Sequence, residues 1–140
     1  MTTVVVDASV AAKWLANEPG SKAAEVLLDD DLVAPDLLYT EVANILWKKT
    51  MRAEMTAEVA GLAARWLLHV PMRIHDGAGL FAESMALAQR LKHPAYDCFY
   101  LAAALRSDCR LVTADRRLYE RCGRDDAGAV QGRVELLTGA

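Results

Sequence analysis

Four acidic residues stand where a carboxylate is locally unusual, and their side chains are the best suited to chemistry in this sequence: Asp7, Glu41, Asp97 and Asp115. Acidic groups near a core cost free energy unless a positive charge pairs with them. Two like charges about 6 Å apart at an effective dielectric of about 20 repel by roughly 3 kcal/mol. A fold that gathers all four would therefore either protonate some of them or recruit a cation.

The donors that these residues offer are hard oxygens, which suit Mg²⁺ or Mn²⁺ and not zinc. Mg²⁺ commonly keeps several waters and contacts one or two carboxylates together with a substrate phosphate. The sequence therefore predicts a metal-dependent enzyme, and hydrolysis of a phosphodiester by a metal-activated water is the reaction that fits. Two alternatives stay open: another metal-dependent nuclease or phosphatase, and a non-catalytic α/β interaction module whose acids only cap helices.

Each carboxylate also has a purely structural explanation. Asp7 and Asp115 both follow a strand-like run and could cap the helix that begins after it. Asp97 lies in the first turn of its predicted helix, where a negative charge could interact favourably with the helix dipole. Glu41 is harder to explain in this way, because it projects toward the apolar side of its predicted helix; the alternative is a glutamate whose stem is buried and whose carboxylate reaches water.

Three polar residues could support the carboxylates. Thr113 precedes Asp115 by two positions, so both face one side of the strand end, where a hydroxyl could orient a carboxylate or a metal-bound water. Ser9 is a candidate donor to the same site or a helix cap. Asn44 lies three residues after Glu41 and points roughly the same way. The alternatives for Thr113 and Asn44 are β-propensity and an ordinary polar helix position.

The elements that must position these residues alternate along the chain. The sequence predicts strands at 3–6, 32–34, 70–74, 110–113 and 134–137, and helices at 10–15, 22–28, 37–49, 56–68, 78–91, 96–105 and 116–121. This alternation is typical of an α/β fold with a mostly parallel sheet of about four to five strands flanked by helices. Sites in such sheets form at the carboxyl ends of the strands, where Asp7 and Asp115 fall. Without repeats or linkers, residues 1–140 are expected to form a single domain.

Composition excludes several classes of protein. The net charge of −3 carries no global basic signature of a nucleic-acid binder, and the three cysteines form no CxxC pair. Phosphate-binding loops of the GxxxxGK[ST] and GxGxxG types are absent, as is HExxH. Charged residues interrupt every apolar stretch, and the amino-terminal run stops at Asp7, so we expect neither a membrane segment nor a signal peptide. We expect a cytoplasmic protein.

The chain resembles the PIN-domain nucleases, and most closely the VapC-type toxins of toxin–antitoxin pairs. The resemblance runs from about Val4 to Leu137 and is carried by four segments in order: Val-Val-Val-Asp7-Ala-Ser9-Val, Glu41-Val-Ala-Asn44-Ile-Leu, Tyr96-Asp97-Cys-Phe-Tyr100-Leu-Ala-Ala and Leu-Val-Thr113-Ala-Asp115. Any one segment is a weak signal, whereas four in the same order are a specific one.

The resemblance implies a ribonuclease whose acidic pocket holds Mg²⁺ or Mn²⁺ on the four carboxylates. It assigns the hydroxyl beside the last aspartate to Thr113 and the helix asparagine to Asn44. It further implies a structured RNA substrate such as tRNA or rRNA, a small cognate antitoxin that inserts a segment into the active-site groove, and a homodimer. Basic residues near the motifs are candidates for phosphate contacts, with ordinary solvated charge as the alternative: Lys13, Lys48 and Arg116.

Overall fold

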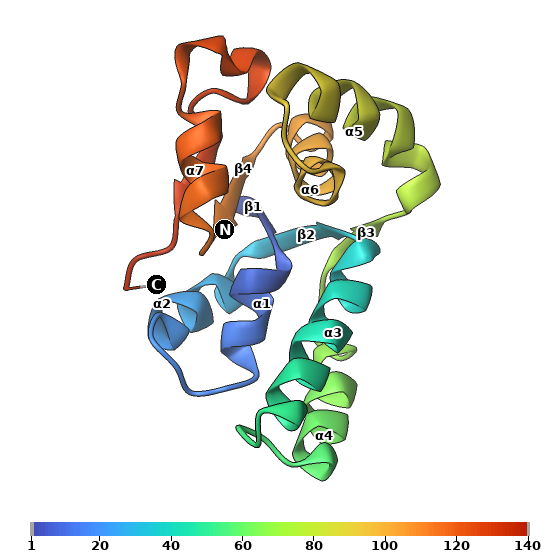
Figure 1. Ribbon diagram of the computed structural model, residues 1–140, viewed down its shortest axis with the longest axis vertical. Helices are drawn as coiled ribbons and strands as arrows, with labels where there is room; N and C mark the ends of the chain where they lie inside the picture. Colours follow the sequence, from blue (N-terminus) through green and yellow to red (C-terminus); the bar gives the residue numbers. More distant parts are fainter. Residues whose placement is uncertain (1, 140) are drawn as a thin grey trace.

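A computed structural model describes residues 2–139, which are built around a five-stranded sheet in the order β3-β2-β1-β4-β5 (Figure 1). All of its strand pairings are parallel. The strands are β1 (Thr3–Val6), β2 (Asp31–Pro35), β3 (Arg73–His75), β4 (Arg110–Thr113) and β5 (Val134–Leu136). The α-helices are α1 (Ala8–Trp14), α2 (Ser21–Val26), α3 (Leu37–Met51), α4 (Ala57–Leu67), α5 (Gly77–Leu91), α6 (Ala95–Arg106) and α7 (Arg116–Cys122). The predicted α/β fold is confirmed.

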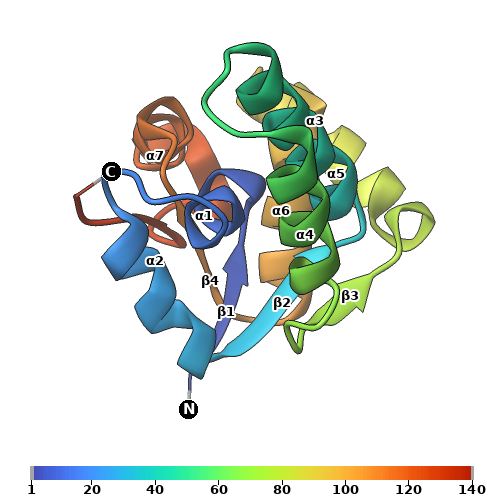
Figure 2. The same cartoon turned by 90° about the horizontal axis from the view of Figure 1, so that it is seen from below.

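The central strand β1 is buried on both faces, which explains its uninterrupted β-branched sequence. Val5 packs in the larger core cluster with residues of α3, α5 and α6. Val4 and Val6 point the other way and pack in a second cluster with residues of α1 and α2. Helices therefore cover both faces of the sheet, as Figure 2 shows from below.

The strand order places a topological switch point at β1. Its two neighbours, β2 and β4, lie on opposite sides, so the chain leaves the sheet in opposite directions after β1 and β4. A crevice opens outside the carboxyl ends of strands at such a point, and ligands of parallel α/β proteins bind there. Asp7 follows β1 directly, and Asp115 lies two residues beyond the end of β4.

Two helices bring the other carboxylates to this crevice. α6 is a central helix, with Cys98 and the segment 100–104 buried, so that Asp97 in its first turn is held at a fixed height above the sheet. α3 buries the stripe Leu38, Val42 and Leu46, and Glu41 lies beside that stripe. The positions of both acids thus follow from the packing of apolar neighbours on the same helix.

The observed elements differ from the predicted ones in small ways. The strand predicted at 70–74 begins only at Arg73, because a turn follows α4 and Pro71 precedes the pairing with β2. The strand predicted at 32–34 is one residue longer at each end, as β2 begins at Asp31, whose carboxylate accepts a hydrogen bond from Thr3. Two 3₁₀ turns were not expected, at Leu27–Asp29 and at Asp125–Val130.

No helix among residues 2–139 is long and apolar enough to cross a membrane. The three tryptophans lie on three different helices, α1, α3 and α4. Trp14 packs against the core, whereas Trp47 and Trp66 on the α3–α4 pair are exposed.

Candidate active site

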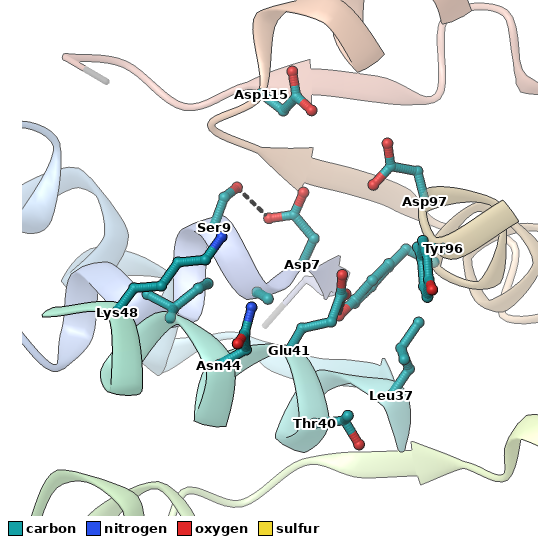
Figure 3. Close-up of a pocket in the computed structure, with 13 residues that line it drawn as sticks. Asp7, Ser9, Leu37, Thr40, Glu41, Asn44, Lys48, Tyr96, Asp97 and Asp115 are labelled. Carbon is teal, nitrogen blue, oxygen red and sulfur yellow. Dashed lines mark hydrogen bonds between the residues drawn. The ribbon is translucent and has the colours of Figure 1, made fainter. Parts of the chain in front are cut away.

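All four predicted carboxylates line one cavity of about 620 Å³ at the carboxyl end of the sheet. They come from four different parts of the chain, and Figure 3 shows their side chains directed toward a shared space. Ser9 and Asn44 line the same cavity, together with Lys48. The fold thus brings together residues that lie more than a hundred positions apart in the sequence.

Asp7 is the most buried of the four acids, at 5% exposure. It caps α1, where its Oδ1 accepts the backbone N–H of Val10 at 3.2 Å. The same oxygen accepts the Ser9 hydroxyl at 2.5 Å, and Oδ2 accepts the hydroxyl of Thr113. The capping explanation offered for Asp7 is therefore correct, and it accounts for only part of the contacts that this carboxylate makes.

The surroundings of Asp7 favour its neutral form. Burial raises its pKa from 3.8 to about 6, the hydrogen bonds from Ser9, Thr113 and Val10 act in the opposite direction, and the charge of Asp97 adds to the increase. A carboxylate whose protein donors do not offset its desolvation gains from a nearby cation. Asp7 therefore has the properties of a carboxylate that a bound cation would stabilise.

Two hydroxyls connect the ends of β1 and β4 through Asp7. Ser9 donates to Asp7 and accepts the N–H of Ala114 at 2.9 Å. Thr113 is fully buried, donates to Asp7 and accepts the N–H of Asp115 at 3.0 Å. Each hydroxyl donates one hydrogen bond and accepts another, so the relative position of the two aspartates is fixed by contacts between the ends of the two strands.

Glu41 accepts a hydrogen bond from the Tyr100 hydroxyl at 2.6 Å, and Tyr100 is 1% exposed. Partial burial raises the pKa of Glu41 above its ordinary value, the Tyr100 hydrogen bond lowers it, and Asp97 raises it. Tyr100 was read from the sequence as part of an apolar helix. The available signal was its position three residues after Asp97, on the same side of α6, combined with the need of a buried phenol for a partner.

Asp97 contacts a histidine that was not among the predicted site residues. His93 Nε2 lies 2.6 Å from Asp97 Oδ2, and the His93 side chain is only 12% exposed. His93 lies in the turn between α5 and α6, four residues before its partner. The contact uses Oδ2 of Asp97 and leaves Oδ1 outside the hydrogen bonds found among residues 2–139.

Asp115 caps α7 and accepts the backbone N–H groups of Arg117 at 2.9 Å and Leu118 at 3.5 Å through Oδ1. The capping explanation is again correct, and again it uses one oxygen only. The other oxygen of Asp115, Oδ2, makes none of these contacts. Oε2 of Glu41 likewise makes no hydrogen bond among the described residues, since Tyr100 donates to Oε1.

The donor set suits a hard divalent ion. No three His, Cys, Asp or Glu side chains among residues 2–139 stand close enough to form a complete metal cluster by themselves. Mg²⁺ does not require one, because it keeps several waters and takes one or two carboxylates directly. Asp97, Asp115 and Glu41 each keep one oxygen outside the contacts described above, and Asp7 gains from a positive neighbour. These residues therefore fit Mg²⁺ or Mn²⁺.

The basic residues proposed for substrate contacts have different surroundings. Lys48 lines the cavity, seven residues after Glu41 on α3. Lys13 is bound to Glu18 at 3.3 Å and to the Pro19 carbonyl at 2.7 Å, and it does not line the cavity. Arg116 is exposed on the first turn of α7, next to Asp115, and is also not among the lining residues.

Comparison with known proteins identifies relatives over most of the chain. Residues 4–124 match the family model of the PIN domain. Ribonuclease VapC3 of Pyrobaculum aerophilum is 34% identical over 122 residues, which cover 84% of this chain and 93% of that protein.

Solved structures share the fold. The crystal structure of PAE2754 from Pyrobaculum aerophilum superposes with a TM-score of 0.70 at 20% identity and covers 97% of this chain and 84% of that one. A chain of a toxin–antitoxin complex from Klebsiella pneumoniae gives a TM-score of 0.58 at 18% identity, with 94% and 95% covered. The sequence match and the shared fold agree with the order of the four acidic segments. This chain therefore belongs to the PIN-domain family, among the VapC ribonucleases.

Proposed function

We propose that this chain is a Mg²⁺- or Mn²⁺-dependent endoribonuclease toxin, with residues 1–140 acting as one domain. The observation that carries the proposal is the convergence of Asp7, Glu41, Asp97 and Asp115, from four separate elements, on one cavity at the switch point of the sheet. Capping a helix does not require the four acids to converge, and two of them, Glu41 and Asp97, cap no helix. The non-catalytic module accounts for this arrangement less well, and the family match favours a ribonuclease over a phosphatase.

The residues have separate roles in this mechanism. Asp7, Asp97 and Asp115 hold the ion, directly or through water, and Glu41 helps to bind it or orients the attacking water. When bound, the ion supplies charge stabilisation at the scissile phosphate and lowers the pKa of a water molecule. Ser9 and Thr113 keep Asp7 in place, while Tyr100 and His93 fix Glu41 and Asp97.

Partners follow from the family. We propose an RNA substrate, with structured tRNA or rRNA as the expected targets, cut in the cytoplasm, and a small cognate antitoxin that occupies the cavity. The complex from Klebsiella pneumoniae, a structural neighbour described by its name as toxin–antitoxin, supports the second partner. A homodimer is proposed as well, and the exposed Trp47 and Trp66 provide apolar surface of the kind that subunit contacts bury.

A substrate panel tests the proposal. Purified protein is incubated with tRNA, rRNA, single-stranded DNA and a phosphate monoester in Mg²⁺, Mn²⁺ or EDTA. We expect cleavage of RNA alone, only with metal, and its near loss in Asp97→Asn. Asp29→Asn, an exposed acid outside the cavity, serves as the matched control and should cleave at the wild-type rate. Preferred hydrolysis of DNA or of the monoester, or full activity of Asp97→Asn, would contradict the assignment.

Induction in cells provides a second test. Expression should arrest growth, and Asp7→Ala should abolish the arrest. Calorimetric titration with Mg²⁺ separates the enzyme from a non-catalytic module, because caps alone do not bind Mg²⁺ tightly.

A further inference from the structure

A second cavity, of about 550 Å³, lies between the carboxyl-terminal end of α5 and α7, and its wall is basic. Five cationic side chains line it: Arg90, Lys92, Arg117, Arg121 and Arg124. The lining includes only two acids, Glu120 and Asp126, so the five positive and two negative charges leave an excess of three. The chain as a whole has a net charge of −3. This basic cavity is therefore a local reversal of the overall charge.

One of the five cations is committed to the fold. Arg121 donates to the Leu91 carbonyl at 2.7 Å and pairs with Asp126 at 2.9 Å. The ion pairs found among residues 2–139 include none of the other four, and all four are exposed: Arg90, Lys92, Arg117 and Arg124. Exposed cations that lack an acidic partner are available to an anionic ligand.

Arg90 lies close to the backbone of a glycine. The 3₁₀ segment Asp125–Val130 contacts α5 beside the end of that helix (Figure 1). Gly128 there adopts a φ of +64°, and a Cβ atom on it would lie 1.9 Å from Arg90 Nη2. The guanidinium thus packs directly on the bare backbone of Gly128, a contact that a side chain would prevent.

The basic cavity adjoins the acidic one through two direct contacts. His93 lines the basic cavity and binds Asp97, which lines the acidic cavity. Arg117 lines the basic cavity, and its backbone N–H binds the carboxylate of Asp115 in the acidic cavity. His93 and Arg117 therefore connect two adjacent cavities, one lined by carboxylates and the other by cations. An RNA strand whose scissile phosphate lies at the carboxylates would place its next phosphates beside the cations.

We propose that Arg90, Lys92, Arg117 and Arg124 form a phosphate-binding subsite for the RNA strand on one side of the scissile bond. This inference rests on the proposed ribonuclease function and adds a path for the substrate. Several phosphates at once match the charge and size of the basic cavity, and guanidinium groups bind phosphate oxygens through paired hydrogen bonds. The contacts lie away from the reacting atoms, so they contribute to binding in the ground state and the transition state alike.

A pair of charge-matched double variants tests the subsite. Arg117→Gln with Arg124→Gln removes two cations of the basic cavity. Lys22→Gln with Arg65→Gln removes two exposed cations on α2 and α4, far along the chain from both cavities, and changes the net charge equally. Steady-state cleavage is measured for a long single-stranded RNA and for a dinucleotide, whose only phosphate is the scissile one and which therefore has no phosphate to place in the basic cavity.

We expect the basic-cavity variant to raise KM for the long RNA about tenfold, because two phosphate contacts are lost, while kcat is unchanged. The logarithm of affinity for that RNA, measured in EDTA to prevent cleavage, should depend on salt with a slope shallower by about 0.7 for each lost contact. The dinucleotide should be cut equally by all three proteins, and the control variant should match the wild type throughout.

Other outcomes overturn the subsite without touching the nuclease assignment. Wild-type KM and salt dependence in the basic-cavity variant would remove these residues from the RNA path. An equal loss in the control variant would show a general charge effect. A variant that keeps RNA binding and loses affinity for an acidic segment of the antitoxin would assign the surface to the protein partner. Absence of RNA cleavage by the wild type, in contrast, contradicts the proposed function itself.

Discussion

The hydroxyl of Thr113 donates a hydrogen bond to the carboxylate of Asp7, across 106 positions of sequence and between the ends of two adjacent parallel strands. Both partners are buried, and the hydroxyl also accepts the N–H of Asp115. One threonine thus sets the distance between two of the four acids. Hydrogen bonds that hold metal ligands in position normally affect the affinity of a site for its ion.

Thr113→Val keeps the β-branched shape and removes this hydroxyl. We expect the free energy of unfolding to fall by about 1–3 kcal/mol, because a buried carboxylate and an N–H group each lose a partner. Urea denaturation measures the loss, and Thr138→Val, an exposed position, is the control. Metal-dependent RNA cleavage should decrease as well. A variant as stable as the wild type would show that water replaces the hydroxyl.

Asp7 makes the metal-free protein less stable as pH rises. Its pKa is raised from 3.8 to about 6 in the folded chain, so the folded state binds the proton more tightly than the unfolded state does. Its contribution is fully present below pH 4 and is lost as pH rises through about 6. The raised pKa of Glu41 acts in the same direction. The shift of about two units corresponds to about 3 kcal/mol.

Asp7→Asn should remove this dependence and make the metal-free chain more stable than the wild type at pH 7. Denaturation in EDTA at several pH values between 4 and 8 is the measurement. Added Mg²⁺ should stabilise the wild type at pH 7 and have little effect on the variant. An unchanged pH profile in Asp7→Asn would place the titrating group elsewhere.

Sequence reasoning located Asp7 and Asp115 because a carboxylate that ends a strand of a parallel sheet has only one edge at which to lie. Glu41 was accessible through the apolar side of its helix. Tyr100 and His93 were missed for a physical reason: a buried phenol and a histidine look like core and surface residues until a partner from a distant element is known.

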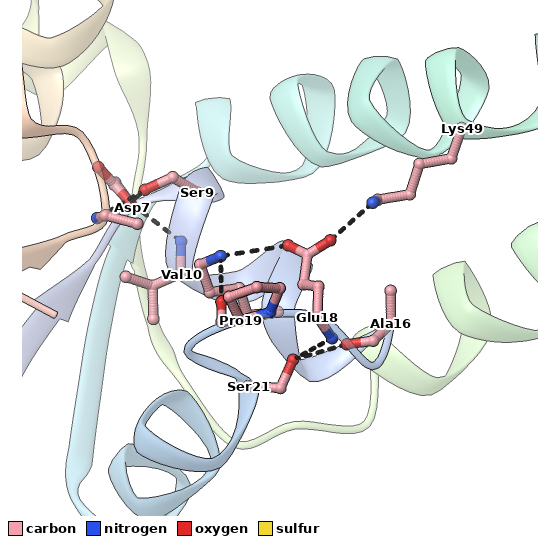
Figure 4. A network of polar contacts seen from close by, with 10 residues as sticks. Asp7, Ser9, Val10, Ala16, Glu18, Pro19, Ser21 and Lys49 are labelled. Atoms are coloured by element: carbon pink, nitrogen blue, oxygen red, sulfur yellow. Dashed lines mark hydrogen bonds and ion pairs between the residues drawn. The ribbon is translucent and has the colours of Figure 1, made fainter. Parts of the chain in front are cut away.

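The interpretation of Lys13 shows the same limit. Its closeness to Asp7 in the sequence suggested a role with the substrate, while its contact with Glu18 depends on how the chain turns after α1. Partial burial acts to raise the pKa of Glu18, and Lys49 and Lys13 together hold it below its ordinary value. Figure 4 shows Glu18 between α1, which Asp7 caps, and Lys49 on α3. A contact between residues this far apart in the sequence cannot be predicted from a local sequence pattern.

Tyr100→Phe tests the support of Glu41. Loss of the hydroxyl leaves Glu41 free to move, and we expect Mg²⁺ affinity to drop between about tenfold and a hundredfold while the fold is retained. Calorimetry gives the affinity, and circular dichroism checks the fold. Tyr119→Phe removes a hydroxyl from a more exposed tyrosine on α7 and should change neither quantity. Wild-type affinity in Tyr100→Phe would make the hydrogen bond dispensable for metal binding.

Gly128→Ala tests the placement of Arg90. Both Gly128 and Gly132 have positive φ, and a Cβ atom would meet Arg90 at the first and nothing within 4 Å at the second. We therefore expect each alanine variant to lose about 1 kcal/mol or more of stability from backbone strain. Only Gly128→Ala should also weaken binding of a long RNA, since only there is the guanidinium displaced. Equal RNA affinities for the two variants would argue against a role of Arg90.

The hydroxyl links between Asp7 and the end of β4 also bear on the synthesis of the protein. A chain emerging from the ribosome exposes Asp7 early, whereas Thr113 at the end of β4 and Asp115 just after it are made more than a hundred residues later. A nascent fragment that ends before them lacks one of the four acids and the hydroxyl that holds Asp7. The pocket therefore cannot be complete before Asp115 has been synthesised and β4 has paired with β1, so translation delays the appearance of a finished site.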